Sequence, residues 1–166
     1  MPGTPRAGFV GFSPMRRKTR PLAGHLDDVF AAVDYVKKLD YVDSNRIGIM
    51  GFSRGALLTF EAGIRRSDFK AIIIMAVAPG RGNLDELLLH ADRVSTPVLL
   101  LVSENDTVRV NIVKGVQMVK DALQSAGKQV RLIVYPPYQY NGHLMFFEVG
   151  DYWKDVQKFL QKHLKE

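Results

Sequence analysis

The sequence predicts an α/β fold, with an open, mostly parallel sheet of about five strands and helices on both faces. Short apolar runs typical of strands alternate along the chain with segments whose apolar residues recur at helical spacing. Two of the runs, 71–77 and 98–102, are apolar without alternation, as expected for strands that helices cover on both faces. With 166 residues, the chain is most simply one domain.

The first half of the chain predicts two strands and two helices. Residues 7–12 form an apolar run that ends at Ser13-Pro14, which indicates a strand followed by a basic, turn-forming segment. Apolar residues at helical spacing then predict an amphipathic helix over 26–39. A second strand is expected at 46–50, and a helix at 54–65.

The second half continues the alternation. The remaining strands are expected at 71–77, 98–102 and 130–135. Between and after them, helical spacing predicts a short helix at 84–90, a longer one from Ile112 to Leu123 that Gly127 stops, and a final helix with a buried stripe over 152–164. The five strands follow one another with helical crossovers, so their carboxyl ends meet at one edge of the sheet.

The motif Gly51-Phe52-Ser53-Arg54-Gly55 joins the strand at 46–50 to the helix at 54–65. A serine at such a strand–turn–helix elbow sits in a strained turn with its hydroxyl exposed, and glycines at both flanks would avoid clashes with the neighbouring strand and helix. The placement predicts a nucleophilic serine. The alternative is a glycine-rich turn with an ordinary serine.

Partners for Ser53 are expected in the loops after the later strands. Asp106 follows the strand at 98–102, and His143 follows the strand at 130–135, which gives the order serine, acid, histidine. A serine hydroxyl is a poor nucleophile until a neutral imidazole takes its proton, and a carboxylate orients that imidazole. Glu104, two residues before Asp106, is the competing acid.

The sequence resembles the α/β-hydrolases, nearest to the dienelactone-hydrolase-like and prolyl-oligopeptidase-like serine esterases. The resemblance rests on residues 43–56, on 97–102 with Asn105-Asp106-Thr107-Val108, on Ala126-Gly127-Lys128, and on Gly142-His143. It implies that Ser53 is the nucleophile, Asp106 the acid, His143 the base, and the backbone N–H of Arg54 one oxyanion donor. Dienelactone hydrolases proper use cysteine, so the serine indicates the esterase side of the group.

The resemblance also implies that N-terminal strands are missing, so that the fold is a truncated α/β-hydrolase. One missing strand carries the loop that supplies the second oxyanion donor. We therefore expect residues 1–166 to be a single catalytic domain that forms the C-terminal part of a longer chain, or that gains a sheet edge from a partner subunit. If the strand at 7–12 moves beside the strand that carries Ser53, the amide of Ser13 or Met15 could replace the missing donor.

The function predicted from these residues is a serine carboxylester hydrolase that acts through an acyl-enzyme on small or short-chain acyl esters. A serine oligopeptidase or an acyltransferase with the same triad is the alternative among enzymes. A non-catalytic, hydrolase-like binding domain is the alternative outside them. Aromatic and apolar residues around His143 could wall an acyl pocket or belong to the core; these are Tyr138, Tyr140, Met145, Phe146 and Phe147.

The charge composition limits the classes of binding partner that we expect. The 23 Lys and Arg against 17 Asp and Glu give a net charge of +6, concentrated at Arg16-Arg17-Lys18 with Arg20 and at Lys154, Lys158, Lys162 and Lys165. Without aromatic interleaving or a nucleic-acid motif, these clusters are expected to be solvated surface. A small-molecule ester is the expected partner, with no nucleic acid and no membrane, and a homo-oligomer remains an option.

No cofactor and no metal are predicted. The sequence has no cysteine and no metal-ligand spacing among its histidines, so His25, His90 and His163 are assigned surface or packing roles. No signal-peptide core is recognised near the N-terminus, which favours a cytoplasmic protein.

Overall fold

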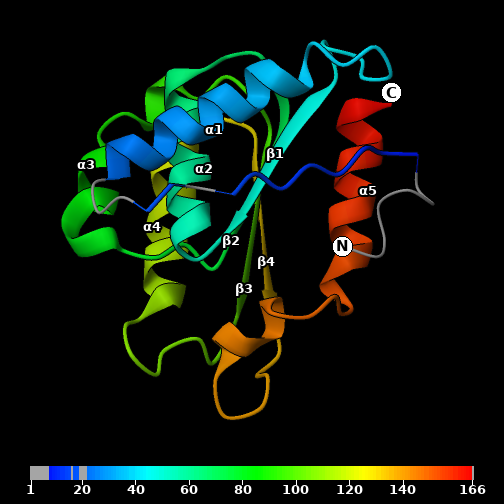
Figure 1. The fold of residues 1–166 in the computed structure, drawn as a ribbon. Coiled ribbons are helices and arrows are strands. Elements are labelled where there is room, and N and C mark those ends of the chain that lie inside the picture. Colours follow the sequence, from blue (N-terminus) through cyan, green and yellow to red (C-terminus); the bar gives the residue numbers. More distant parts are fainter. Residues whose placement is uncertain (1–7, 16, 19–21, 166) are drawn as a thin grey trace.

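The computed structural model describes residues 8–15, 17–18 and 22–165 (Figure 1). Within them, four strands alternate with helices. The strands are β1 (Ile47–Phe52), β2 (Phe69–Met75), β3 (Val98–Ser103) and β4 (Val130–Tyr135). The helices are α1 (Leu22–Val36), α2 (Arg54–Arg65), α3 (Asn83–Leu88), α4 (Ile112–Ser125) and α5 (Tyr152–Leu164), with short 3₁₀ turns η2 (Gly80–Gly82), η3 (Ala91–Arg93) and η4 (Gly142–Phe146).

The four strands form one parallel sheet in the order β1-β2-β3-β4. Helices α2 and α4 pack on one face and α5 packs on the other, while α1 packs against α2 (Figure 1). The sheet and its two helical layers confirm the predicted α/β class. Because all strands are parallel, the loops that follow them open at the same edge.

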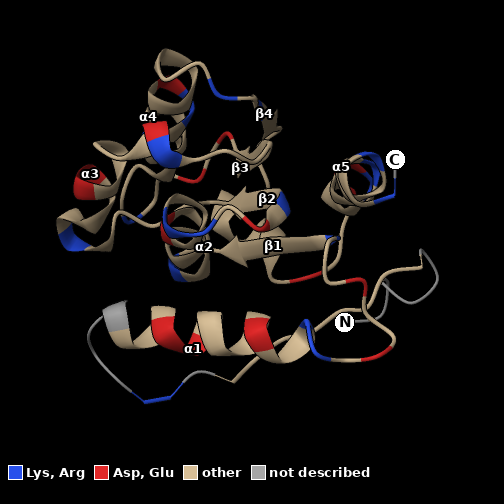
Figure 2. Ribbon diagram, turned by 90° about the horizontal axis from the view of Figure 1, so that it is seen from above, with Lys and Arg blue, Asp and Glu red and all other residues tan. Residues whose placement is uncertain are grey.

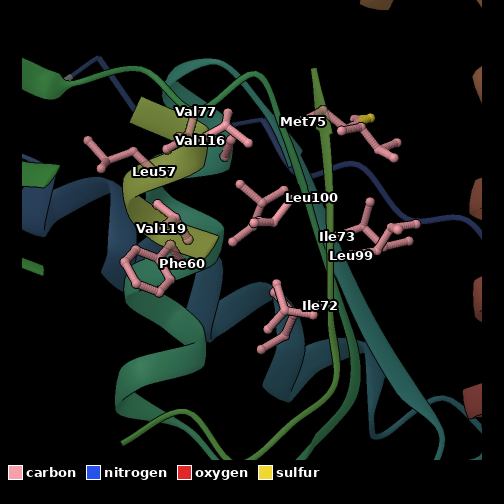
Figure 3. Packing of buried hydrophobic residues seen from close by; sticks show 14 of the residues in the cluster. Leu57, Phe60, Ile72, Ile73, Met75, Val77, Leu99, Leu100, Val116 and Val119 are labelled. Carbon is pink, nitrogen blue, oxygen red and sulfur yellow. The ribbon is translucent and has the colours of Figure 1, made fainter. Parts of the chain in front are cut away.

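The core lies at β2 and β3, whose side chains alternate between the two helical layers (Figure 3). Ile72 and Leu100 point toward α2 and α4, whereas Ile73 and Leu99 point to the opposite face. Nearly all residues of these two strands are buried, as the unbroken apolar runs predicted. This buried pair of strands gives the loops at its carboxyl end a rigid base.

The predicted first strand is absent, so the sheet has four strands and not about five. Residues 9–12 are coil, and Ala7 lies outside the described residues. The apolar side chains of this segment pack without strand pairing: the Phe12 ring lies 5.8 Å from that of Tyr35 on α1, and Phe9 packs against the core with Lys165 Nζ 4.9 Å from its ring. A strand needs a hydrogen-bonded neighbour, and in the described part of the chain β1 pairs with β2 alone.

Element ends differ from the predictions by a few residues. The helix expected at 26–39 runs over Leu22–Val36 and then closes in turns up to Val42, and the short helix expected at 84–90 ends at Leu88. The stop after α4 is as predicted: Gly127 has φ +69°, and its N–H donates to the carbonyl of Gln124.

Charged side chains join separate elements on the surface. Figure 2 shows acidic residues along α1 and basic residues on α5. Arg17 pairs with Asp28 of α1, and Arg66 contacts Asp34 of α1 and Asp68, the residue before β2. Arg16 and Arg20 lie outside the described residues. None of the helices in the described ranges has the length and apolar character needed to cross a membrane.

Candidate active site

Ser53 lies between the last residue of β1 and the first residue of α2, with φ 54° and ψ −115°. A non-glycine residue with positive φ is strained and persists only where the surroundings hold it. Two backbone hydrogen bonds fix Ser53 in this conformation. The N–H of Ser53 donates to the carbonyl of Met75, 2.9 Å away, and the Ser53 carbonyl accepts from the N–H of Ala78, 3.2 Å away. The strand-to-helix elbow predicted from the motif is therefore present.

The two glycines of the motif play different parts. A Cβ at Gly51 would lie 2.2 Å from the carbonyl oxygen of Gly55 and 2.5 Å from Thr59 Oγ1, so no larger residue fits there. At Gly55, by contrast, a Cβ would meet no described atom of a neighbouring element within 4 Å. The prediction that both glycines avoid clashes is right for Gly51 and wrong for Gly55.

The structure brings Ser53, His143 and Asp106 together. His143 Nε2 lies 3.1 Å from Ser53 Oγ, and His143 Nδ1 lies 2.8 Å from Asp106 Oδ2. A carboxylate accepts hydrogen bonds, so Nδ1 carries the proton and Nε2 is left to accept one from the serine hydroxyl. This is the arrangement in which an imidazole can act as a base toward Ser53.

Asp106 is buried, while Glu104 is exposed. Burial raises the pKa of the Asp106 carboxyl, and the hydrogen bond from His143 acts in the opposite direction. Asp106 is thus held where its hydrogen bond with His143 is shielded from water. Of the two acids considered from the sequence, Asp106 is the one hydrogen-bonded to His143.

Aromatic rings flank His143. The Phe52 ring lies 4.6 Å from the imidazole and 5.3 Å from the ring of Phe147, which is 69% exposed. Phe146 is buried in the core, and Tyr140 is largely exposed. Of the residues suggested as pocket walls, Phe147 therefore presents an apolar face to solvent beside the histidine. Sequence reasoning missed Phe52, although its place next to Ser53 in the elbow was the signal.

The N–H of Arg54 belongs to the first residue of α2. Helix N-termini present N–H groups and a partial positive charge, so this end of α2 suits a developing oxyanion. The suggestion that Ser13 or Met15 supplies a second donor required the preceding segment to pair as a strand beside β1. That segment is coil, and Met15 is 97% exposed, so the suggestion loses its basis.

The other histidines lie on other elements. His25 is buried in α1, with Nδ1 3.5 Å from an Arg54 guanidinium nitrogen. His90 precedes η3, and His163 on α5 lies 4.5 Å from the Phe159 ring. Over the described ranges, no group of three or more His, Asp and Glu side chains is arranged to hold a metal.

Two asparagines that sequence reasoning gave no role border the acid and base loops. Asn141 Oδ1 accepts a hydrogen bond from the His143 N–H, 3.1 Å away, at the start of η4. Asn105 precedes Asp106 and bonds across to the loop after β4. Asn105 was part of the motif that carried the resemblance, but its contacts depend on tertiary structure.

A parallel sheet with a strained serine elbow, and with a histidine and an acid at the ends of later strands, defines an α/β-hydrolase fold. The family model of the dienelactone hydrolase family matches residues 11–146. The chain belongs to the dienelactone hydrolase family.

Individual proteins are similar to parts of this chain. The uncharacterized protein YcjY of Escherichia coli (strain K12) is 46% identical over 46 residues, which are 28% of this chain and 15% of YcjY. Among solved structures, acylaminoacyl peptidase of Pyrococcus horikoshii has a TM-score of 0.72 at 20% identity, over 86% of this chain and 28% of the peptidase. An esterase of Pyrococcus furiosus has a TM-score of 0.67 at 20% identity, over 89% of this chain and 66% of the esterase. At these identities the structural matches show a shared fold, and the chain spans only part of each relative.

Proposed function

We propose that this chain is a serine carboxylester hydrolase that acts through an acyl-enzyme on small or short-chain acyl esters. The observation that carries the proposal is the line of contacts from Ser53 Oγ to His143 Nε2 at 3.1 Å and from His143 Nδ1 to Asp106 at 2.8 Å. Hydrogen-bond distances of this kind suit proton transfer between a nucleophile and its base. Membership of a hydrolase family adds to this support.

In the proposed acylation, Ser53 Oγ attacks the ester carbonyl while its proton passes to His143 Nε2. Asp106 accepts the hydrogen bond from Nδ1 and stabilises the imidazolium that forms. The carbonyl oxygen becomes an oxyanion near the N-terminus of α2, where the Arg54 N–H donates to it. When the tetrahedral intermediate collapses, the C–O bond to the alcohol breaks and His143 returns the proton to the departing oxygen.

Deacylation repeats these steps with water. His143 takes a proton from the water as its oxygen attacks the acyl carbon, and then returns it to Ser53 Oγ as the carboxylic acid leaves. The acyl group would lie beside Phe52 and Phe147, because these rings adjoin His143 and Phe147 offers exposed apolar surface. A surface of two rings favours small or short acyl groups.

A fluorophosphonate probe tests the proposal, since it phosphonylates only an activated serine. We expect one label per chain, at Ser53, and none in Ser53→Ala. Labelling at another residue would overturn the assignment of the nucleophile. A folded wild-type chain that does not react would instead favour the non-catalytic binding domain. A series of p-nitrophenyl esters of increasing acyl length would then identify the preferred acyl group. Acyl-peptide amides would be tested beside them, and faster hydrolysis of the amides would indicate a peptidase.

A further inference from the structure

Asn105 connects the loop that carries Asp106 to the loop that leads to His143. Its Oδ1 lies 2.9 Å from the N–H nitrogen of Tyr138 and 3.0 Å from Ser103 Oγ. Its Nδ2 lies 3.3 Å from the Tyr138 carbonyl and 3.1 Å from the Gln139 carbonyl. The single Ser103 hydroxyl proton also lies within reach of the Pro136 carbonyl, 3.0 Å from Oγ, so the Asn105 amide makes three hydrogen bonds to the loop after β4 and competes with Pro136 for a fourth.

The side chain of Asn105 continues the pairing of β3 with β4 after the backbone ladder stops. The ladder ends where Ser103 faces Tyr135. Beyond it, the Asn105 amide bonds both the N–H and the carbonyl of Tyr138, as the backbone of a neighbouring strand would. It thereby joins two loop segments that lie beyond the sheet.

The loop beyond Tyr138 is tightly held against the same residues. Gln139 has φ +48°, a strained conformation, and its carbonyl accepts from Asn105. A Cβ at Gly142 would lie 2.7 Å from Asn105 Oδ1 and 2.7 Å from Ser103 Oγ, so the backbone just before His143 rests directly on residues 103 and 105. Asp106 follows Asn105 in the chain, and its partner His143 follows Gly142.

We propose that Asn105 is a positioning residue that fixes the His143 loop on the Asp106 loop and so sets the contact of Asp106 with His143. Its effect on catalysis rests on the proposed function, but its effect on that contact does not. Without the amide, two backbone carbonyls and one N–H lose the hydrogen bonds that Asn105 makes with them, and one of these carbonyls belongs to the strained Gln139. The hydrogen bond from His143 Nδ1 to Asp106 should then become loose.

Two substitutions and one control separate positioning from general stability. Asn105→Ala removes the amide. Asn105→Asp keeps its shape but turns a carboxylate oxygen toward the carbonyls of Tyr138 and Gln139. The control is Thr96→Val, because Thr96 is buried and its hydroxyl donates to the Phe69 carbonyl at the opposite end of β3. If Asn105→Ala does not fold, Asn105→Asp carries the test.

The first readout is the proton on His143 Nδ1, followed by NMR in chains with ¹⁵N-labelled histidine and assigned with His143→Ala. A proton held between imidazole and carboxylate gives a downfield resonance whether or not the protein turns over substrate. We expect this resonance in the wild type and in Thr96→Val, and its loss or broadening in both Asn105 variants. Retention in the Asn105 variants, or equal loss in Thr96→Val, would overturn the proposal.

The second readout is the rate of fluorophosphonate labelling against probe concentration. Misplacement of a catalytic group by about 1 Å can cost about 10²-fold, so the maximal rate should fall roughly 10- to 100-fold in the Asn105 variants. The probe concentration at half-maximal rate should change little, because Asn105 does not adjoin the acyl site. If the wild type is not labelled at all, the proposed function fails, and the resonance alone still decides the role of Asn105.

Discussion

A Cβ placed on Gly51 would lie 2.2 Å from the carbonyl oxygen of Gly55, so the end of β1 and the first turn of α2 approach as closely as only glycine allows. Gly55 itself has no such neighbour. The two glycines look equivalent in the motif, but only the first is required by packing.

We predict that Gly51→Ala destabilises the fold by at least roughly 2 kcal/mol, since the new methyl group meets backbone that cannot move aside. Gly55→Ala should leave stability unchanged or raise it by up to about 1 kcal/mol, because alanine is the better helix former. Urea denaturation of both variants measures the difference. Equal stability of the two would contradict the geometry of the elbow.

We predict that Ser53→Ala and His143→Ala each lower the rate of ester hydrolysis roughly 10⁴- to 10⁶-fold, because in the proposed mechanism Ser53, His143 and Asp106 act as a unit. Asp106→Asn should also be severe, whereas Glu104→Gln should stay near the wild type, because Glu104 is exposed and Asp106 bonds His143. Single-turnover hydrolysis of a p-nitrophenyl ester, with circular dichroism to verify folding, measures these effects. A greater loss in Glu104→Gln than in Asp106→Asn would show that the acid is misassigned.

We predict that Ser53→Gly is more stable than Ser53→Ala by about 1 kcal/mol. The backbone of residue 53 has φ 54° and ψ −115°, a conformation that costs a non-glycine residue about 1–3 kcal/mol. Glycine removes that strain, but part of the gain in stability is lost because glycine loses more conformational entropy than alanine on folding. Neither variant has a nucleophile, so chemistry does not complicate the comparison. Thermal unfolding should give the higher Tm for glycine, and the reverse order would argue against strain at the elbow.

The stability of Asp106→Asn relative to the wild type should rise with pH. Burial raises the pKa of Asp106, so the native chain holds this proton more tightly than the unfolded chain. In the wild type, stability therefore falls as pH rises from the unfolded pKa of about 4 through the folded pKa. Asparagine does not titrate, so the stability of the variant does not fall for this reason as pH rises. Urea titrations at pH 3 and pH 7 test the sign, and a fall in the stability of Asp106→Asn relative to the wild type from pH 3 to pH 7 would contradict it.

Asp68→Asn should behave in the opposite way. The hydrogen bonds of Arg66 and then Lys37 hold the pKa of Asp68 well below its usual range. Its contribution to stability is therefore present above the unfolded pKa of about 4 and is lost as pH falls toward the folded pKa. We expect the variant to lose about 1–3 kcal/mol at neutral pH, as hydrogen bonds to charged groups are worth, and the loss to narrow in acid. Urea titrations at pH 3 and pH 7 measure the stability of Asp68→Asn relative to the wild type. A loss of stability that is the same at both pH values would argue against the ion pairs of Asp68.

Local pattern was enough to predict much of this fold. The helices α2, α4 and α5 and the strands β1 to β4 follow from the spacing of apolar residues, because each pattern lies within one segment. The elbow at Ser53 and the order of Ser53, Asp106 and His143 also follow from residues near strand ends. Parallel strands bring those ends to one edge, so three distant residues could be expected together before any distance was known.

Long-range contacts decided the rest. The run at 9–12 has the composition of a strand but is coil, because pairing requires a neighbouring strand that a local pattern does not reveal. The Phe52 ring beside His143 and the three hydrogen bonds of Asn105 to Tyr138 and Gln139 join residues 33 to 91 positions apart in the chain. The sequence by itself determined which residues could carry the chemistry. Only the tertiary structure decided how the acid and base loops are held together, because side-chain hydrogen bonds between loops depend on how distant segments meet in space.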